Sequence, residues 1–187
     1  MDYGSLRDIL AMEKEVERLD TDEAKQFLPV AKFFKAFFYI RMTERLGDIP
    51  MSEAVKGEEG NFTPKYDTQK DVYTNCLKLL EEANDELALY AGKASALTND
   101  LYFNGDLTKW RKAVNTFRVR VLLSLSKRNA EMNVAGQLRE IVSNPGKYPL
   151  MESIRDNMQI TYYGTADDQY TLYPDNGSKY ASIYFIG

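Results

Sequence analysis

The sequence predicts a mainly α-helical fold that gives way to an irregular, loop-rich C-terminal portion. Five segments carry apolar residues at the three-to-four-residue spacing of amphipathic helices. Glycine, proline and polar runs separate these segments, as at Gly47 and Pro50. The last stretch, 148–187, lacks this period and holds seven of the 13 tyrosines. We therefore assign residues 1–147 to a helical scaffold and 148–187 to the start of a loop-rich lobe.

The first two predicted helices differ in how much of their surface is apolar. The first spans Ser5 to Leu19 and carries one loose apolar face. The second runs from about Glu23 to Leu46 and is nearly apolar all round in its middle, which predicts a central, buried helix. Pro29 lies in its first two turns, where a proline either kinks a helix or marks a later start. Gly47 and Pro50 end it.

Three further helices follow a polar connection at 51–66. Asp67 or Thr68 caps the third helix, which extends to about Ala91, and Thr68 with Asp71 has capping-box spacing. The fourth helix runs from about Leu107 to Asn129. The fifth runs from about Met132 to Ser143, before an Asn-Pro-Gly stop at 144–146. Cys76 and Trp110 lie on apolar stripes, so a buried, inert thiol and a core indole are expected.

Composition excludes several kinds of chemistry. The 187 residues include no histidine, which removes Ser-His-Asp and Cys-His catalysis and histidine-ligated zinc. A single cysteine allows neither an intrachain disulfide nor a cysteine-based zinc site. With 24 basic and 28 acidic residues, the net charge of −4 does not favour nucleic-acid binding. Nucleotide-binding, hydrolase and zincin motifs are missing. We predict no catalytic residue, no metal and no cofactor.

Two charged features allow alternative interpretations. The fourth helix is basic without an intervening acid, which suits an anionic lipid or phosphate, but pairing with the acidic third helix is the favoured interpretation. Carboxylate pairs such as Glu81 with Asp85 meet a residue requirement of glycosidases, although adjacent acids on a helix are usually solubilising. Asp167, Asp168 and Asp175 offer oxygen ligands for calcium, but they lack EF-hand spacing and more simply form turns.

The tyrosine-rich C-terminal portion is the feature that most suggests a binding surface. Aromatic faces stack on the C–H faces of sugars, and exposed aromatic side chains also mark protein interfaces. The alternative is that the tyrosines pack beneath the irregular lobe. A short strand is possible at 158–163. The candidate ligand-binding residues are Tyr162, Tyr163, Tyr170, Tyr173, Tyr180 and Tyr184.

An ordered set of motifs points to a family. It includes Gly-Asp-Ile-Pro at 47–50 and Gly-Asp-x-x-Lys-Trp at 105–110. The full set is Phe27, Ala31, Lys32 and Ala36, then Arg45 to Ala54, Phe62 to Gln69 with Val72 and Tyr73, Asp100 to Asp106, and Lys109, Trp110, Lys112, Asn115 and Arg120. In this order and spacing, over roughly residues 20–165, the chain resembles the SusD/RagB family of outer-membrane nutrient-binding lipoproteins, in its second SusD-like branch.

The resemblance implies a fold of tetratricopeptide-like helix pairs with a loop-rich lobe packed on them. It implies a protein without covalent chemistry that captures a nutrient, above all a glycan, and passes it to a SusC-type TonB-dependent porin. It also implies a surface-exposed lipoprotein of the outer membrane. The lipidated cysteine and the signal peptide of the family are not seen in this chain. The motif residues are interpreted as scaffold, and none is assigned to ligand contact.

Competing functions remain open at this point. The first is glycan capture without turnover, and the second is a peptide-binding or purely protein-interaction helical module, because helix-pair solenoids present extended binding surfaces. A hydrolase is the third. The chain stops within the apolar run Tyr184 to Gly187, so we expect a fragment of a longer protein.

Overall fold

The computed structural model describes residues 3–160, and helices dominate this part of the chain. The long helices are α1 (Tyr3–Leu19), α3 (Leu28–Leu46), α4 (Gln69–Leu89), α5 (Leu107–Ser124) and α7 (Val134–Ser143). Short elements are α2 (Asp22–Lys25), α6 (Asn129–Met132) and the 3₁₀ turns η1 (Gly57–Glu59), η2 (Ser126–Arg128) and η3 (Ile154–Asp156). The mainly α fold class is confirmed.

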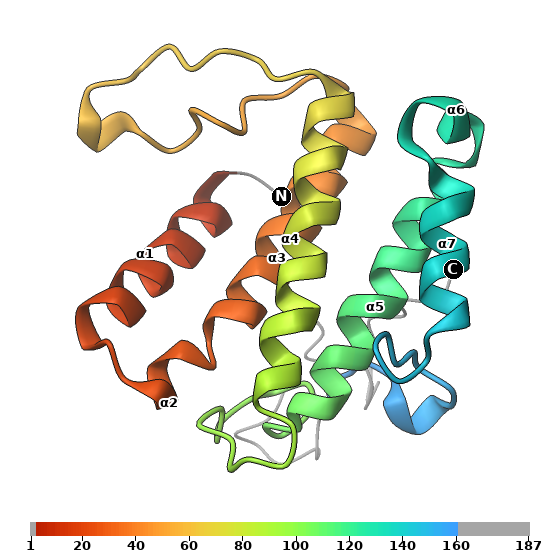
Figure 1. Ribbon diagram of the computed structural model, residues 1–187. Coiled ribbons are helices and arrows are strands. Elements are labelled where there is room, and N and C mark those ends of the chain that lie inside the picture. The colour runs from red at the N-terminus through yellow and green to blue at the C-terminus, as the bar shows by residue number, and fades with distance from the viewer. Residues whose placement is uncertain (1–2, 161–187) are drawn as a thin grey trace, which may run out of the picture.

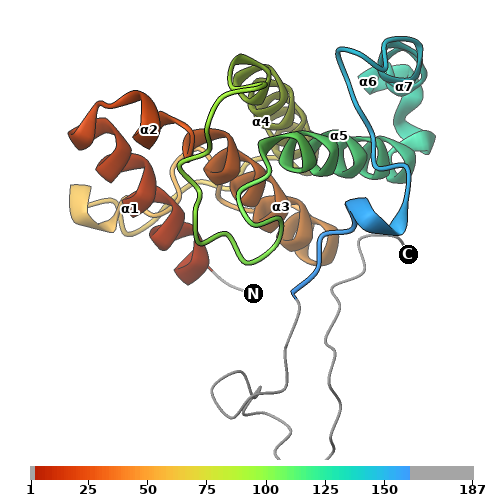
Figure 2. The ribbon, with the colours of Figure 1, turned by 90° about the horizontal axis from the view of Figure 1, so that it is seen from below.

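The long helices stand in one row, each antiparallel to the helix before it (Figures 1 and 2). Helix α3 packs against α1 and α4, α4 packs against α5, and α5 packs against α7. The two long connections lie at opposite ends of the helices, α3 to α4 at the top and α4 to α5 at the bottom of Figure 1. This array of helix pairs is the architecture that the family resemblance implied.

An aromatic cluster forms the centre of the core. Trp110 and Phe33 are almost fully buried, with ring centroids 5.7 Å apart in an edge-to-face arrangement. Phe117 also packs edge-to-face on Phe33 at 5.6 Å, which joins α3 to α5. Cys76 on α4 is buried as well, and burial raises the pKa of its thiol. The central position of α3, the core role of Trp110 and the inert Cys76 are therefore confirmed.

The predicted helix from Glu23 to Leu46 is wrong at its beginning. The chain forms the single turn of α2, and α3 starts only at Leu28 with a proline in its first turn. Pro29 thus marks a later start. Backbone amides in the first turn of a helix make no intrahelical hydrogen bond, so a proline is tolerated there. Thr68, and not Asp67, caps α4: its hydroxyl oxygen accepts a hydrogen bond from the Asp71 amide at 3.2 Å.

The predicted helices Leu107 to Asn129 and Met132 to Ser143 also differ from the structure. Helix α5 ends at Ser124, and η2 and α6 follow as separate turns. Asn133 takes a left-handed conformation with φ 49°, so α7 begins one residue later. Residues 158–160, the described part of the possible strand, contain no strand.

Polar contacts fasten the segment after α7 to the basic helix α5. Buried Asn115 donates to the Asn84 side-chain oxygen at 2.8 Å and to the Pro149 carbonyl at 3.2 Å. Lys112 pairs with Asp156 at 3.1 Å. Arg118 of α5 pairs with Glu81 of α4, and Arg111 donates to the Asn84 side-chain oxygen of α4 at 3.0 Å, so part of the basic helix does pair with the acidic helix beside it. No helix within residues 3–160 is long and apolar enough to cross a membrane.

Candidate ligand-binding loop and cleft

The connection between α3 and α4, residues 48–67, is closed at its base by backbone hydrogen bonds. Ile49 and Asp67 form an isolated antiparallel bridge, with N–O distances of 3.2 and 3.0 Å. Gly47 ends α3 with φ 78°, a conformation that glycine adopts without steric cost. The Asp48 carboxylate accepts the Gln69 amide at 2.8 Å, which joins the loop to the start of α4. We call residues 48–67 the 48–67 loop.

The carboxylate of Asp67 organises this base from inside. Its oxygens accept the Met51 amide at 2.8 Å, the Ser52 amide at 2.7 Å and the Ser52 hydroxyl at 2.8 Å. Burial acts to raise the pKa of Asp67, but these hydrogen bonds to the ionised form outweigh it, and the pKa lies below its ordinary value. The motif residues at both ends of the loop therefore hold its two arms together.

A second set of contacts shapes the outer part of the loop. Glu53 accepts the Lys65 amide at 3.1 Å and the Asn61 side-chain amide at 3.4 Å. Between them, Val55 has φ 59°, a left-handed conformation that a β-branched residue rarely adopts. Such strain is held only where surrounding contacts enforce it, and strained residues are found preferentially at ligand sites. The loop is thus a shaped excursion and not a slack linker.

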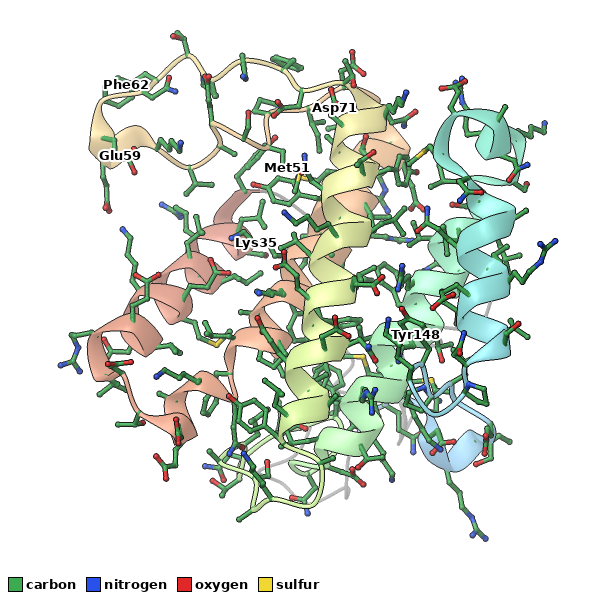
Figure 3. All side chains as sticks on the ribbon, in the orientation of Figure 1. Lys35, Met51, Glu59, Phe62, Asp71 and Tyr148 are labelled. Carbon is green, nitrogen blue, oxygen red and sulfur yellow. The ribbon has the colours of Figure 1, made fainter. Side chains whose placement is uncertain are left out.

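The outer part of the loop exposes two aromatic side chains. Phe62 is 82% exposed and Tyr66 is 72% exposed, and they are the exposed aromatic side chains within residues 3–160. Figure 3 shows Phe62 at the outer end of the loop, away from α4. An exposed apolar ring costs free energy in water, and here two lie within five residues on a pinned loop. Exposed rings of this kind suit stacking on sugars or contact with a protein.

A cleft of about 880 Å³ lies between the loop and helices α1 and α3. Two tyrosines join its walls: Tyr3 donates to the Pro50 carbonyl at 2.7 Å, and Tyr39 lies 3.5 Å from the Met51 carbonyl. Burial, followed by the charges of the neighbouring Tyr66 and Asp67, raises the pKa of Tyr3. In Figure 3, Glu59 extends from the loop on the side that faces α1.

The charges of the cleft are balanced across its walls. Lys14 of α1 faces Glu58 of η1 at 3.6 Å, and Lys35 of α3 pairs with Glu13 of α1 at 2.8 Å. A lining with both donors and acceptors and little net charge suits a neutral polyhydroxylated ligand better than a strongly charged one. Within residues 3–160, no group of three or more acidic or cysteine side chains is placed to hold a metal ion.

A smaller, apolar cavity of about 380 Å³ lies between the start of α3 and the α4–α5 connection, at the opposite end of the helices from the 48–67 loop. Phe34, Tyr102 and the edge of Trp110 line it. The Asp100 carboxylate holds this connection in place, since it accepts the Trp110 indole N–H at 2.7 Å and the Tyr102 amide at 2.9 Å. The aromatic rings that line this cavity pack largely on one another, so they offer less free surface for stacking than Phe62 and Tyr66.

The tyrosines predicted as ligand contacts lie outside the described residues: Tyr162, Tyr163, Tyr170, Tyr173, Tyr180 and Tyr184. The aspartates considered for calcium, Asp167, Asp168 and Asp175, lie outside them too. These assignments stay predictions. Sequence reasoning did not select Phe62 and Tyr66, because it treated 51–66 as a polar connection. The signal available was two aromatic residues on either side of Pro64 and Lys65, in a segment without helical period.

The fold and the loop define a helical-repeat scaffold that presents a pinned aromatic loop. Comparison with known proteins assigns this scaffold to a family. A SusD-like family model, described as "Starch-binding associating with outer membrane", matches residues 1–183. The chain belongs to this SusD-like family. A comparison with curated proteins found no match.

Solved structures agree with the family assignment. A SusD homolog from Bacteroides fragilis is 35% identical with a TM-score of 0.77, and the match covers 96% of this chain and 37% of that one. A second SusD homolog from the same species is 31% identical with a TM-score of 0.74, over 87% of this chain and 34% of that one. A chitin-binding protein is 30% identical with a TM-score of 0.63, and the match covers 85% of this chain and 34% of that one. The chain spans little more than a third of these relatives.

Proposed function

We propose that this chain is part of a nutrient-binding protein that captures a glycan without altering it, and that the 48–67 loop contributes to the binding surface. The observation that carries the proposal is the pair of exposed rings, Phe62 and Tyr66, on a loop held in shape by Asp67 and Glu53. Because the loop is already ordered by its own hydrogen bonds, little conformational entropy is lost when a sugar stacks on it.

The family relationship supports the choice of a glycan. The family model is described as starch-binding, and one similar structure is a chitin-binding protein. We further propose that the whole protein is a surface-exposed outer-membrane lipoprotein that delivers its cargo to a SusC-type TonB-dependent porin. The tyrosines of the C-terminal portion remain proposed contacts on the same grounds. A boundary between the helical scaffold and a loop-rich lobe near residue 147 also remains a proposal.

Calorimetric titration tests the proposal. A panel of malto- and chito-oligosaccharides of increasing length would be titrated into the 187-residue chain, and each mixture would then be analysed for cleavage products. The proposal expects that at least one class binds and is recovered intact. Recovery of shortened sugars would replace capture with hydrolysis. If no sugar binds and peptides of the same length do, the alternative of a peptide-binding module takes its place.

A further inference from the structure

One ion pair in the cleft under the 48–67 loop differs from the other charges there. Lys35 of α3 and Glu13 of α1 both line the cleft, and Lys35 Nζ donates to Glu13 Oε2 at 2.8 Å. Their side chains are only 24% and 20% exposed, whereas those of Lys14 and Glu58 are 76% and 92% exposed. In the view of Figure 3, Lys35 lies below the loop, on the side of α3 toward α1. The pair is therefore half-buried in the wall of the cleft.

Both members of this pair keep hydrogen-bonding capacity for a ligand. Within the residues that the structure describes, Glu13 Oε1 accepts no hydrogen bond, and Lys35 donates to Glu13 alone. An ionised carboxylate accepts at both oxygens, and a lysine ammonium group has N–H donors beyond the one used in a single ion pair. The cleft thus presents a free acceptor and a free donor side by side.

A third polar group, the Tyr39 hydroxyl, lies in the same wall. Its contact with the Met51 carbonyl is 3.5 Å long, at the limit for a hydrogen bond. Burial raises the pKa of Tyr39, and the neighbouring charges that add to this rise include that of Glu13. The hydroxyl therefore keeps its proton, and it is a further donor close to the ion pair.

Two adjacent hydroxyls of a sugar fit this arrangement. Neighbouring hydroxyl oxygens on a pyranose ring stand at about the separation of two hydrogen-bonded atoms, which is also the separation of Lys35 Nζ and Glu13 Oε2. One hydroxyl then donates to the free Glu13 oxygen while the other accepts from Lys35. Both hydrogen bonds have an ionised partner, so they are stronger than hydrogen bonds between neutral groups.

The same ion pair disfavours a charged ligand. A ligand carboxylate would compete with Glu13 for Lys35, and a ligand ammonium group would compete with Lys35 for Glu13. Either ligand would leave one half-buried charge without its partner, which costs free energy. A pair of hydroxyls bonds to both side chains and leaves the ion pair intact.

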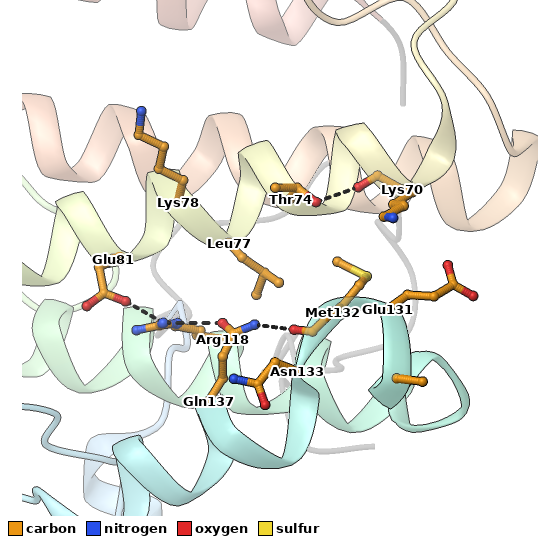
Figure 4. Close-up of a pocket in the computed structure, with 11 residues that line it drawn as sticks. Lys70, Thr74, Leu77, Lys78, Glu81, Arg118, Glu131, Met132, Asn133 and Gln137 are labelled. Atoms are coloured by element: carbon orange, nitrogen blue, oxygen red, sulfur yellow. Dashed lines mark hydrogen bonds and ion pairs between the residues drawn. The ribbon is translucent and has the colours of Figure 1, made fainter.

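A second concave surface of the molecule does not offer this chemistry. A groove of about 670 Å³ between α4 and the α6–α7 turn also contains an ion pair, Arg118 with Glu81 (Figure 4). There Glu81 Oε2 is engaged by Arg118, and Glu81 Oε1 accepts the Tyr148 hydroxyl at 2.7 Å. Both carboxylate oxygens already have partners, so a sugar hydroxyl finds no free acceptor beside a free donor.

We propose that Glu13 and Lys35 are specificity-determining residues of the cleft and bind two adjacent hydroxyls of one sugar residue. This inference rests on the proposed glycan-binding function and extends it, because it names the hydroxyl pattern that the cleft recognises. The ligand is a neutral sugar residue with two adjacent unsubstituted hydroxyls, such as the 2- and 3-hydroxyls of a 1,4-linked hexose. The exposed rings of the 48–67 loop add stacking but do not select this pattern.

Calorimetric titration of the 187-residue chain with maltotetraose and with cellotetraose tests the proposal. Both sugars carry free 2- and 3-hydroxyls on their inner residues, and we expect at least one of them to bind. The same tetrasaccharide methylated at these hydroxyls is expected to bind about tenfold or more weakly, because a methyl ether cannot donate to Glu13 and a hydrogen bond to a charged group is worth about this factor. This comparison uses the unaltered chain, so it does not depend on the folding of a variant.

A double variant locates the contact. Glu13→Gln with Lys35→Gln removes both charges together, so neither is left unpaired. We expect it to bind the free tetrasaccharide about tenfold or more weakly than the unaltered chain does, and to bind the free and methylated sugars almost equally. Lys112→Gln with Asp156→Asn is the matched control, because it neutralises an ion pair of similar burial that does not line the cleft. Circular dichroism checks that both double variants are folded.

The outcomes separate this inference from the glycan proposal. If methylation or the double substitution leaves the affinity for a bound tetrasaccharide unchanged, the diol contact is overturned and glycan capture stands. The diol contact is also overturned, with capture intact, if neither tetrasaccharide binds but a chito-oligosaccharide does. If no sugar binds, both proposals fall.

Discussion

Replacement of Asp67 by alanine is expected to loosen the 48–67 loop and lower the stability of the chain. The substitution removes three hydrogen bonds to a carboxylate, from the Met51 amide and from the amide and hydroxyl of Ser52. A hydrogen bond to a charged group contributes about 1.5 to 3 kcal/mol when it is buried. Asp67 is only partly buried, so water replaces some of this stabilisation. We expect a loss of about 2 to 3 kcal/mol in the free energy of unfolding.

Urea denaturation followed by circular dichroism measures this loss. For a chain of this size the same change lowers Tm by about 4 to 12 °C. Asp67→Asn retains the shape and one acceptor, so its loss is expected to be smaller than that of the alanine variant. Asp8→Ala, an exposed aspartate on α1, is the matched control and is expected to change stability by less than about 0.5 kcal/mol.

The reasoning about the loop is refuted if Asp67→Ala unfolds at the same urea concentration as the control. It is also refuted if backbone amides of the loop exchange with deuterium equally fast in both variants. Accelerated exchange confined to the loop, with the helices unchanged, would show that Asp67 acts where the structure places it. Such a variant would also bind a stacking ligand more weakly, because the rings would lose their preorganisation.

Three further predictions concern side chains buried in the fold. Asn115→Ala removes the donor to Asn84 and Pro149, and we expect it to lower the free energy of unfolding by about 1 to 3 kcal/mol in urea titrations. A hydrogen bond from the Glu152 amide lowers the pKa of Asp156 in the folded chain. Its contribution to stability is therefore full above the unfolded-state pKa and is lost as pH falls through the lower folded-state pKa. In Asp156→Asn, Tm should depend less on pH in this acidic range. Cys76 is buried with a raised pKa, so a thiol reagent should label it only at the rate at which the chain unfolds.

Local sequence signals predicted most of the helical scaffold. The apolar stripe of α4 and the threonine cap that begins it act within a few residues of the chain, so they are readable from spacing. The end of α5 was not readable, because 125–128 contains no proline or glycine and the chain turns there through Leu125 and η2. The left-handed Asn133 depends on its contacts across the α6–α7 turn, which a local pattern does not reveal.

The candidate site was less accessible to sequence reasoning than the fold. The hydrogen bonds of Asp67 to Met51 and Ser52 join residues 15 and 16 positions apart, and nothing in the local pattern announces them. Among the motif residues, Gly47 and Asp67 hold the base of the loop, as a scaffold role requires. Phe62 and Tyr66 also belong to the motif, and the scaffold interpretation did not anticipate their exposure. Exposure of Phe62 and Tyr66 is a consequence of this closure, so it appears only once the loop is built.

The central claim is that the exposed rings of the 48–67 loop hold the ligand. The most direct measurement is a calorimetric comparison of the chain with its Phe62→Ala, Tyr66→Ala double variant, using the oligosaccharide that binds most tightly. Ile154→Ala, which removes an equally exposed apolar side chain from η3, is the control. Truncation of both rings removes their stacking on the sugar and is expected to weaken binding about tenfold or more. Equal affinity of the double variant and the control would contradict the claim and move the site away from this loop.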